Sequence, residues 1–214
     1  MQIGCDPKAD STINLTGGKP IRSVLETLRE KGSDITASDI IVKGSCGCWC
    51  AESGGPKPGT GCAGRGIITT FETLEKLKVY DIVKPDIVLY DVLGDVVCGG
   101  FAMPIRQGYA DEVIIVTSGE KMSLYAARNI AGAVNEFGCR GYASLRGIIA
   151  NLKGLNNEIS TIEGLSKELG IPVLAEIPRH CSIQQAEDNC TTVIEAFPES
   201  PLTKLYLNLA NSIV

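Results

Sequence analysis

Short apolar runs alternate with longer amphipathic segments along the chain, and this alternation limits the possible folds more than any other feature. The strand-like runs are residues 2–4, 87–92, 113–117, 147–151 and 173–177. The helix-like segments are residues 21–30, 67–79, 123–137, 159–169 and 201–213. The strand-like runs are apolar throughout, which is typical of a parallel sheet covered on both faces. We therefore predict an α/β fold with a doubly wound, mostly parallel sheet.

The overall composition adds three expectations. Because no linker, repeat or low-complexity tract interrupts the alternation, residues 1–214 are predicted to form one domain. The formal net charge of −5 disfavours a nucleic-acid partner, which needs a basic face. No apolar run approaches the roughly 20 residues that cross a bilayer, and no basic-then-apolar leader opens the chain, so we expect a cytoplasmic protein.

Nine cysteines and a single histidine narrow the possible chemistry. An odd number of scattered cysteines does not fit a disulfide framework, and reduced thiols are more often structural, metal-binding or redox-active. A Ser-His-Asp triad or a histidine-rich metal centre is hard to build from His180 alone.

Two acidic segments follow predicted strands, where parallel sheets collect their functional loops. Asp91 and Asp95 form a D-x-x-G-D pattern, in which a carboxylate can hold Mg²⁺ through water and the glycine lets the loop move with a γ-phosphate. Asp6, Lys8 and Asp10 follow residues 2–4 and face the same edge. The alternative for both segments is an ordinary helix cap.

Cys62 and Cys98 are each flanked by glycine, in "GTGCAGRG" and "VVCGGF". Glycine permits close backbone approach and leaves amide groups free to bond sulfur. A [4Fe–4S] cluster needs four thiolates, and a symmetric dimer would supply two from each chain. The alternative is a pair of buried, inert cysteines.

Cys46, Cys48 and Cys50 form a C-x-C-x-C run inside residues 43–66, the longest irregular stretch of the chain. An irregular stretch of this length is usually functional in a compact domain. Together with Cys62 the run could hold zinc or a cluster, although C-x-C spacing is less typical of structural zinc than C-x₂-C. A surface loop without metal is the alternative.

Taken together, these segments resemble the nitrogenase iron protein family and its nitrogenase-like relatives. The segments that match almost letter for letter are "GCDPKADST", "ESGGPKPGTGCAGRG" and "YDVLGDVVCGGFAMPIR". The resemblance covers the whole chain and is strongest up to about residue 106. The resemblance implies a homodimer with one bridging [4Fe–4S] cluster, held by Cys62 and Cys98 of each chain, and Arg65 on the face that docks to the electron-accepting partner.

The resemblance also implies how the acidic segments bind Mg-ATP. Asp6, Lys8 and Asp10 would belong to the first nucleotide-sensing switch, and Asp91 and Asp95 to the second. Asp95 would lie near the attacking water, so Asp95, Asp10 and Lys8 would be the catalytic residues. A single segment would then couple ATP hydrolysis to the cluster that Cys98 holds.

Four further positions match those that surround the adenine in the family, namely Asn151, Pro178, Gln184 and Glu187. His180 departs from the aspartate that usually follows "PR" in the family. The C-x-C-x-C run is a second departure, because only Cys50 has a family counterpart.

The largest departure is at the start of the chain. The family begins with a strand, the loop G-K-G-G-I-G-K-S and a helix, and this sequence contains no G-x-x-x-x-G-K-[ST] pattern. We therefore expect a P-loop NTPase fold without its first strand, P-loop and first helix. A buried strand and helix contribute on the order of 10 kcal/mol, comparable to the whole stability of a domain. The printed chain is thus expected to fold poorly alone or to be a fragment of a longer protein.

The function that the resemblance implies is ATP-dependent transfer of single electrons. The protein would take electrons from ferredoxin or flavodoxin and pass them to a larger nitrogenase or nitrogenase-like component, which reduces dinitrogen, a tetrapyrrole or another substrate. Two alternatives remain open. One is a cluster-binding module without ATPase activity, and the other is a redox-inactive positioning ATPase of the same superfamily.

Overall fold

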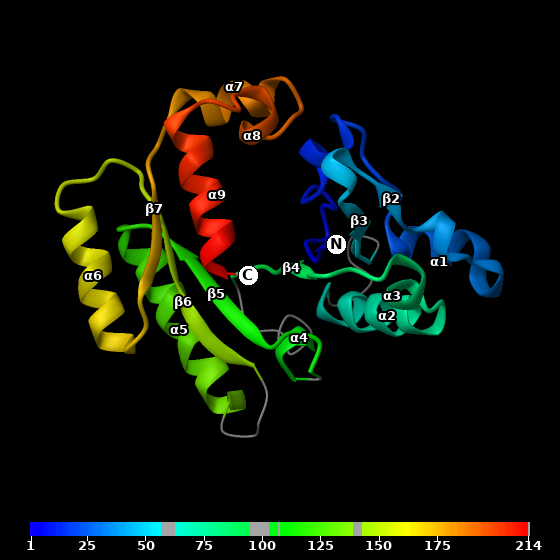
Figure 1. Ribbon diagram of the computed structural model, residues 1–214. Coiled ribbons are helices and arrows are strands. Elements are labelled where there is room, and N and C mark those ends of the chain that lie inside the picture. The colour runs from blue at the N-terminus through cyan, green and yellow to red at the C-terminus, as the bar shows by residue number, and fades with distance from the viewer. Residues whose placement is uncertain (57–62, 95–102, 107, 139–142, 214) are drawn as a thin grey trace. The chain divides into compact units, whose positions relative to one another are not determined.

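The computed structural model describes residues 1–56, 63–94, 103–106, 108–138 and 143–213 (Figure 1). The chain forms two compact units. The first contains Met1–Leu93 and Asn189–Thr191, and the second contains Pro104–Asp188 and the chain from Thr192 onward. The organisation of residues 1–214 as one domain stays a prediction.

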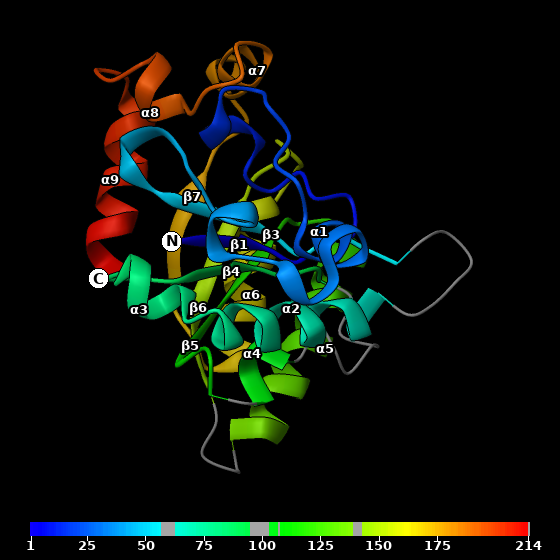
Figure 2. The same ribbon diagram turned by 90° about the vertical axis from the view of Figure 1, so that its right-hand side faces the viewer.

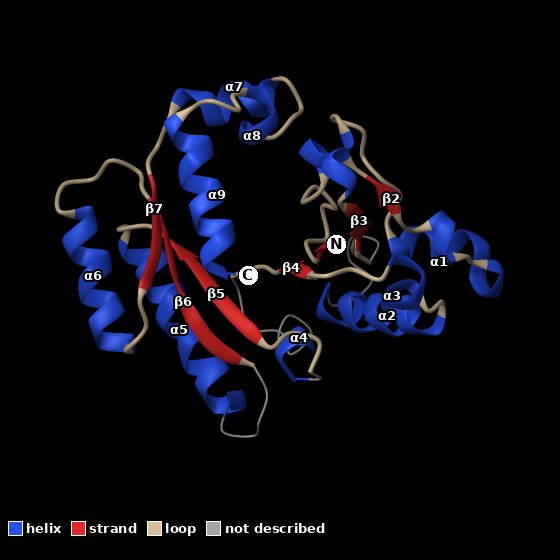
Figure 3. Ribbon diagram, viewed as in Figure 1, coloured by secondary structure: helices blue, strands red, loops and turns tan. Residues whose placement is uncertain are grey.

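The first unit is built on a four-stranded sheet with the order β2-β3-β1-β4 (Figure 3). Its strands are β1 Gln2–Gly4, β2 Val42–Lys43, β3 Trp49–Glu52 and β4 Leu89–Asp91. Strands β3, β1 and β4 run parallel, whereas β2 pairs antiparallel with β3. The last residues of the parallel strands are in register, because Gly4 of β1 is paired with both Glu52 and Asp91.

Helices cover this sheet and connect its strands. They are α1 Val24–Lys31, α2 Ala63–Lys76 and α3 Val79–Val83, with short 3-10 helices η1 Ile13–Thr16, η2 Gly32–Asp34, η3 Ala37–Asp39 and η4 Ser45–Gly47. Helix α2 runs along one face of the sheet (Figure 2) and buries Ile67, Phe71 and Leu74. Ile3 of β1 and Ala51 of β3 are fully buried, which places the core between the sheet and its helices.

The second unit contains a three-stranded parallel sheet with the order β5-β6-β7. Its strands are β5 Glu112–Thr117, β6 Ser144–Asn151 and β7 Val173–Ile177. The helices from residue 103 onward are α4 Met103–Arg106, α5 Lys121–Gly138, α6 Glu158–Leu169, α7 Cys181–Asp188, α8 Val193–Ala196 and α9 Pro201–Ile213. Helices α5 and α6 pack on one face of the sheet and α9 on the other (Figure 1). The core between this sheet and helices α5 and α6 includes Ile115, Ile148 and Leu165.

The predicted α/β class with parallel sheets is confirmed, and two predicted elements, residues 173–177 and 201–213, have the observed bounds. Helix α1 begins at Val24 rather than at residue 21, because the Ser23 hydroxyl accepts a hydrogen bond from the Glu26 N–H (3.3 Å) and so caps the helix. The predicted helix at 67–79 is instead α2, which begins at Ala63, followed by α3.

The description of residues 43–66 as one irregular stretch was wrong. This stretch contains β3, which lies between β2 and β1 in the sheet. The prediction that both faces of the strands are covered fails at several positions, most clearly at Leu89 of β4, which is 56% exposed, and at Val116 of β5, which is 61% exposed. Within the described residues, no helix combines the length and the apolar character needed to cross a membrane.

Candidate functional site

The strongest constellation lies where β1, β3 and β4 end. Asp91 is the last residue of β4, and its Oδ2 accepts a hydrogen bond from the Ser11 hydroxyl (2.5 Å). The Gln2 amide on β1 donates to the same hydroxyl oxygen at 2.9 Å, which fixes the position of Ser11. The structure therefore brings together the two acidic segments that the sequence predicted at one edge of the sheet.

Lys8 is held by the carboxylates of its own loop. Its Nζ lies 3.2 Å from Oδ2 of Asp10 and 3.8 Å from Oδ2 of Asp6, while its backbone N–H donates to Oδ1 of Asp6 (2.8 Å). The hydrogen bond and charge of Asp10, followed by the charge of Asp6, raise the pKa of Lys8. The Lys8 side chain is 70% exposed, so these ion pairs orient the loop more than they stabilise the fold.

Glu52 is a buried carboxyl group that the sequence analysis missed. Glu52 is the last residue of β3, and its side chain is fully buried. Its Oε1 accepts hydrogen bonds from the backbone N–H and the hydroxyl of Thr12, both at 2.7 Å. Within the described residues, Oε2 is buried without a hydrogen-bond partner. Burial raises the pKa of Glu52, the Thr12 hydrogen bonds oppose that rise, and the negative charges of Asp10 and Asp91 add to it.

These side chains fit a magnesium ion that arrives with phosphate. Carboxylate and hydroxyl oxygens of Asp10, Ser11 and Asp91 are the ligands that Mg²⁺ prefers, and the orphaned Oε2 of Glu52 is an oxygen in need of a partner. In the part of the chain that the structure describes, no three Cys, His, Asp or Glu side chains form a ready-made metal site. Mg²⁺ usually keeps waters and substrate phosphates among its ligands, so one or two carboxylates can be enough to hold it.

The predicted base-contacting residues lie in the second unit, at the ends of β6 and β7. Asn151 ends β6 and is paired with Ile177, which Pro178 follows directly. Gln184 and Glu187 lie three residues apart on α7, and both are exposed. Residues three apart share one helix face, so the two side chains are available to the same ligand.

His180 performs a structural task that an aspartate at this position could also perform. Its Nδ1 accepts a hydrogen bond from the backbone N–H of Ser182 (3.2 Å), at the start of α7. An aspartate caps a helix in the same way, through a side-chain oxygen. Although His180 departs from the family pattern, it therefore still caps the start of this helix.

Three predicted residues, Cys62, Cys98 and Asp95, lie outside the described residues. Arg65 lies on α2 and is exposed, as a docking residue must be. Cys46 is exposed, Cys48 is partly buried and Cys50 is buried. Over the described ranges these cysteines do not form a metal-binding group, and a site that also includes Cys62 reaches beyond those ranges and stays a prediction.

Two buried thiols should be chemically silent. Burial, followed by the charges of Asp91 and Glu52, raises the pKa of Cys5 to about 12. Burial is also the main reason that the pKa of Cys50 rises to about 11. Because the thiolate is the reactive form, we expect iodoacetamide at pH 8 to modify exposed Cys181 much faster than either buried thiol. Mass spectrometry of labelled peptides checks this, and equal labelling of Cys5 and Cys181 would contradict it.

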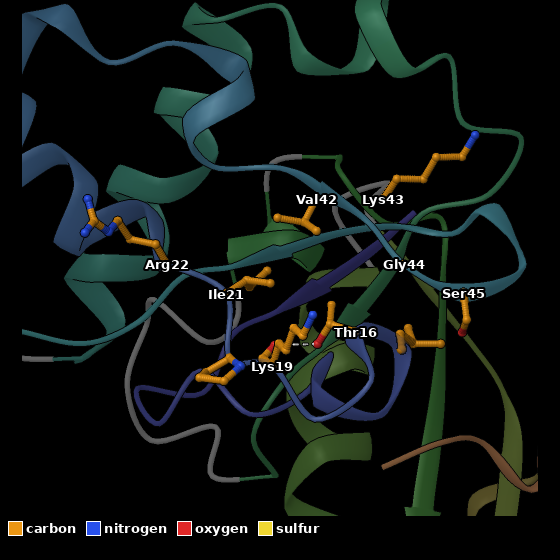
Figure 4. A pocket seen from close by; sticks show the side chains of 10 residues that line it. Thr16, Lys19, Ile21, Arg22, Val42, Lys43, Gly44 and Ser45 are labelled. Atoms are coloured by element: carbon orange, nitrogen blue, oxygen red, sulfur yellow. Dashed lines mark hydrogen bonds between the residues drawn. The ribbon is translucent and has the colours of Figure 1, made fainter.

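A hollow of about 560 Å³ lies between η1 and the β2–η4 segment (Figure 4), and among the described residues none of the predicted nucleotide-binding side chains lines it. Its wall includes Ile21 and Val42, and the Thr16 hydroxyl donates to the backbone oxygen of Lys19 there (2.6 Å). The charged ends of Arg22 and Lys43 extend away from it, whereas the Lys19 nitrogen lies near Thr16 (Figure 4).

The fold is that of the MinD-type ATPases. It matches the septum site-determining protein MinD complexed with Mg-ADP from Pyrococcus horikoshii OT3 with a TM-score of 0.73 and 18% identity, over 99% of this chain and 82% of that one. The cell division ATPase MinD of Pyrococcus furiosus matches with a TM-score of 0.72 and 18% identity, over 99% of this chain and 83% of that one. At these identities the likeness shows the fold alone.

The sequence comparisons identify the family. Residues 1–214 match the model of the 4Fe-4S iron sulfur cluster binding proteins, NifH/frxC family. The chain is 50% identical to the nitrogenase iron protein of Methanospirillum hungatei JF-1, over 100% of this chain and 76% of that protein. It is 45% identical to nitrogenase iron protein 2 of Methanothermococcus thermolithotrophicus, over 100% of this chain and 77% of that protein. The chain belongs to the NifH/frxC family, and the resemblance seen in its motifs is confirmed.

Proposed function

We propose that the protein is an ATP-dependent electron-transfer protein that delivers single electrons to a nitrogenase or nitrogenase-like catalytic component. One observation carries the nucleotide half of this proposal: Ser11, in the loop after β1, and Asp91, at the end of β4, meet through a hydrogen bond beside the orphaned oxygen of Glu52. Membership of a 4Fe-4S family supports the electron-transfer half.

The two loops would act as sensors of the nucleotide state. The oxygens of Asp10, Ser11 and Asp91 would hold a magnesium ion with its phosphates, and Ser11 and Asp91 would then give up the hydrogen bond between them. Loss of that hydrogen bond would free the loop at Ser11. The next residue, Thr12, is anchored by Glu52 at the end of β3. Asp95, four residues beyond Asp91, would then orient the attacking water.

Cys62 and Cys98 would hold the cluster, which stores and releases one electron. A homodimer supplies the four thiolates that a [4Fe–4S] cluster requires, and the segment from Asp91 to Cys98 links phosphate sensing to it. Ferredoxin or flavodoxin is the proposed electron donor, and exposed Arg65 lies on the proposed docking face. A cytoplasmic location stays a prediction.

The proposal is tested by coupling hydrolysis to electron transfer in anaerobically purified protein. We expect Mg-ATP hydrolysis, a reducible iron–sulfur signal and a cluster potential that changes when Mg-ATP is added. Asp91→Asn should lower hydrolysis by about 10²-fold, because it removes a charge from the magnesium site. Asp86→Asn, the same exchange at an exposed position five residues earlier, is the matched control and should leave hydrolysis unchanged.

Two outcomes would replace the proposal with a different function. Iron-loaded protein that neither hydrolyses Mg-ATP nor changes its potential would be a cluster-binding module without ATPase activity. Hydrolysis that proceeds without bound iron, and unchanged when Cys62 and Cys98 are replaced, would identify a positioning-type ATPase.

A further inference from the structure

The Glu158 carboxylate binds two loops through hydrogen bonds instead of capping its own helix. It is the first residue of α6, and the residue before it, Asn157, makes no side-chain capping bond. The Glu158 side chain does not cap its own helix either, but accepts hydrogen bonds from N–H groups that precede it in the chain. It is buried, with only 5% of its surface exposed.

Five hydrogen bonds connect Glu158 to the loops that follow β5 and β6. Oε1 accepts from the backbone N–H groups of Gly119 (3.0 Å) and Lys153 (3.1 Å). Oε2 accepts from those of Lys153 (2.9 Å), Gly154 (2.9 Å) and Leu155 (3.1 Å). All five lengths are ordinary for N–H···O bonds, and a charged acceptor makes each of them stronger than a neutral one.

The charge of Glu158 is balanced by backbone dipoles. Burial raises the pKa of Glu158, but the hydrogen bonds from the four backbone N–H groups outweigh that effect and lower the pKa to about 2. Across the described ranges no lysine, arginine or histidine forms an ion pair with it. The carboxylate is therefore ionised at neutral pH, and the amide groups of the two loops compensate for burying this charge.

The fit at Gly119 is too close for any other residue. A Cβ atom there would lie 2.6 Å from Cγ and 3.2 Å from Cα of Glu158. The N–H of Leu152 meanwhile donates to the backbone oxygen of Ile177 (2.9 Å), which ties the beginning of the same loop to the end of β7. The backbone after Asn151 is thus held on one side by β7 and on the other by Glu158.

We infer that Glu158 is a positioning residue for a purine base, because it fixes the loop that begins at Asn151 against the loop that contains Gly119. This inference rests on the proposed function and on the resemblance to the family, which implies that Asn151 and Pro178 surround the adenine of the nucleotide. Base recognition requires hydrogen-bonding groups at fixed positions, since a loop that must order on binding loses affinity and selectivity. Glu158 supplies that order without touching the ligand.

The test separates base binding from phosphate binding. Dissociation constants of Mg-ADP, Mg-GDP and base-free tripolyphosphate are measured by calorimetry for the wild type, Glu158→Gln and Glu163→Gln. Glu163 is exposed on the same helix, so its variant is the matched control for the loss of one charge. We expect Glu158→Gln to weaken Mg-ADP binding about tenfold and to reduce the preference for Mg-ADP over Mg-GDP, while tripolyphosphate binding stays within about twofold.

Hydrogen exchange of the wild type gives a readout that needs no variant. Mg-ADP, but not tripolyphosphate, should slow exchange of the amides of residues 153–155. Equal exchange with both ligands, or an unchanged Mg-ADP to Mg-GDP ratio in Glu158→Gln, would overturn this inference and leave the proposed function standing. A wild type that binds none of the three ligands would overturn the proposed function, and this inference with it.

Discussion

Replacing either Cys62 or Cys98 with serine is expected to remove nearly all bound iron from anaerobically prepared protein. In a symmetric dimer each substitution deletes two of the four thiolates at once, so the cluster cannot be held by the two that remain. A serine hydroxyl is not deprotonated at neutral pH and does not replace a thiolate. Iron content per dimer and the absorbance of the cluster measure the loss directly.

The control for this prediction is Cys181→Ser. Cys181 is exposed at the start of α7, and we expect the variant to keep the iron content of the wild type. Comparable iron in Cys62→Ser, Cys98→Ser and the wild type would contradict the proposed ligands. Equal loss of iron in Cys62→Ser, Cys98→Ser and Cys181→Ser would indicate general instability of the protein rather than removal of a ligand.

The layout of the fold was largely predictable because local physics determines it. Residues 173–177 are apolar except for Glu176 and are flanked by turns, and Pro201 starts its helix where a proline is most favourable, so both elements have the predicted bounds. The rule that functional loops follow parallel strands also predicted that the segment containing Ser11 would meet Asp91.

The unpredicted features depend on contacts between distant residues. Strand β3 has only four residues and ends in Glu52, so it looked like part of a glycine-rich loop. Glu52 is held by Thr12, 40 residues away, and Glu158 by Gly119, 39 residues away. A buried carboxylate has the same sequence signature as an exposed one, and only the fold shows which amides surround it.

Among substitutions that add one methyl group near the strand-end site, Gly4→Ala is expected to disrupt the site most severely. A Cβ on Gly4 would lie 2.0 Å from Oε2 and 2.6 Å from Cδ of Glu52, and 2.7 Å from Cβ of Ser11. Both neighbours are restrained, Glu52 by its hydrogen bonds to Thr12 and Ser11 by those to Gln2 and Asp91. Relief of the overlap must therefore break at least one of these bonds.

The expected cost is about 3 kcal/mol of the free energy of unfolding, at the upper end of the range for overpacked sites, and it is measured by urea denaturation. Gly132→Ala provides the matched control, because Gly132 lies on exposed α5 surface with nothing within 4 Å of a Cβ. That exchange should stabilise the protein by about 0.5–1 kcal/mol, since alanine favours the helix.

A second measurement locates the damage from Gly4→Ala. Cys5 follows Gly4 directly and is 1% exposed in the wild type. If Glu52 and Ser11 are displaced, the end of β1 loosens and the Cys5 thiol should react with iodoacetamide severalfold faster than in the wild type, while Cys181 labelling stays constant. Wild-type stability together with an unreactive Cys5 in Gly4→Ala would show that the strand ends are not packed as closely as the Gly4–Glu52 contact requires.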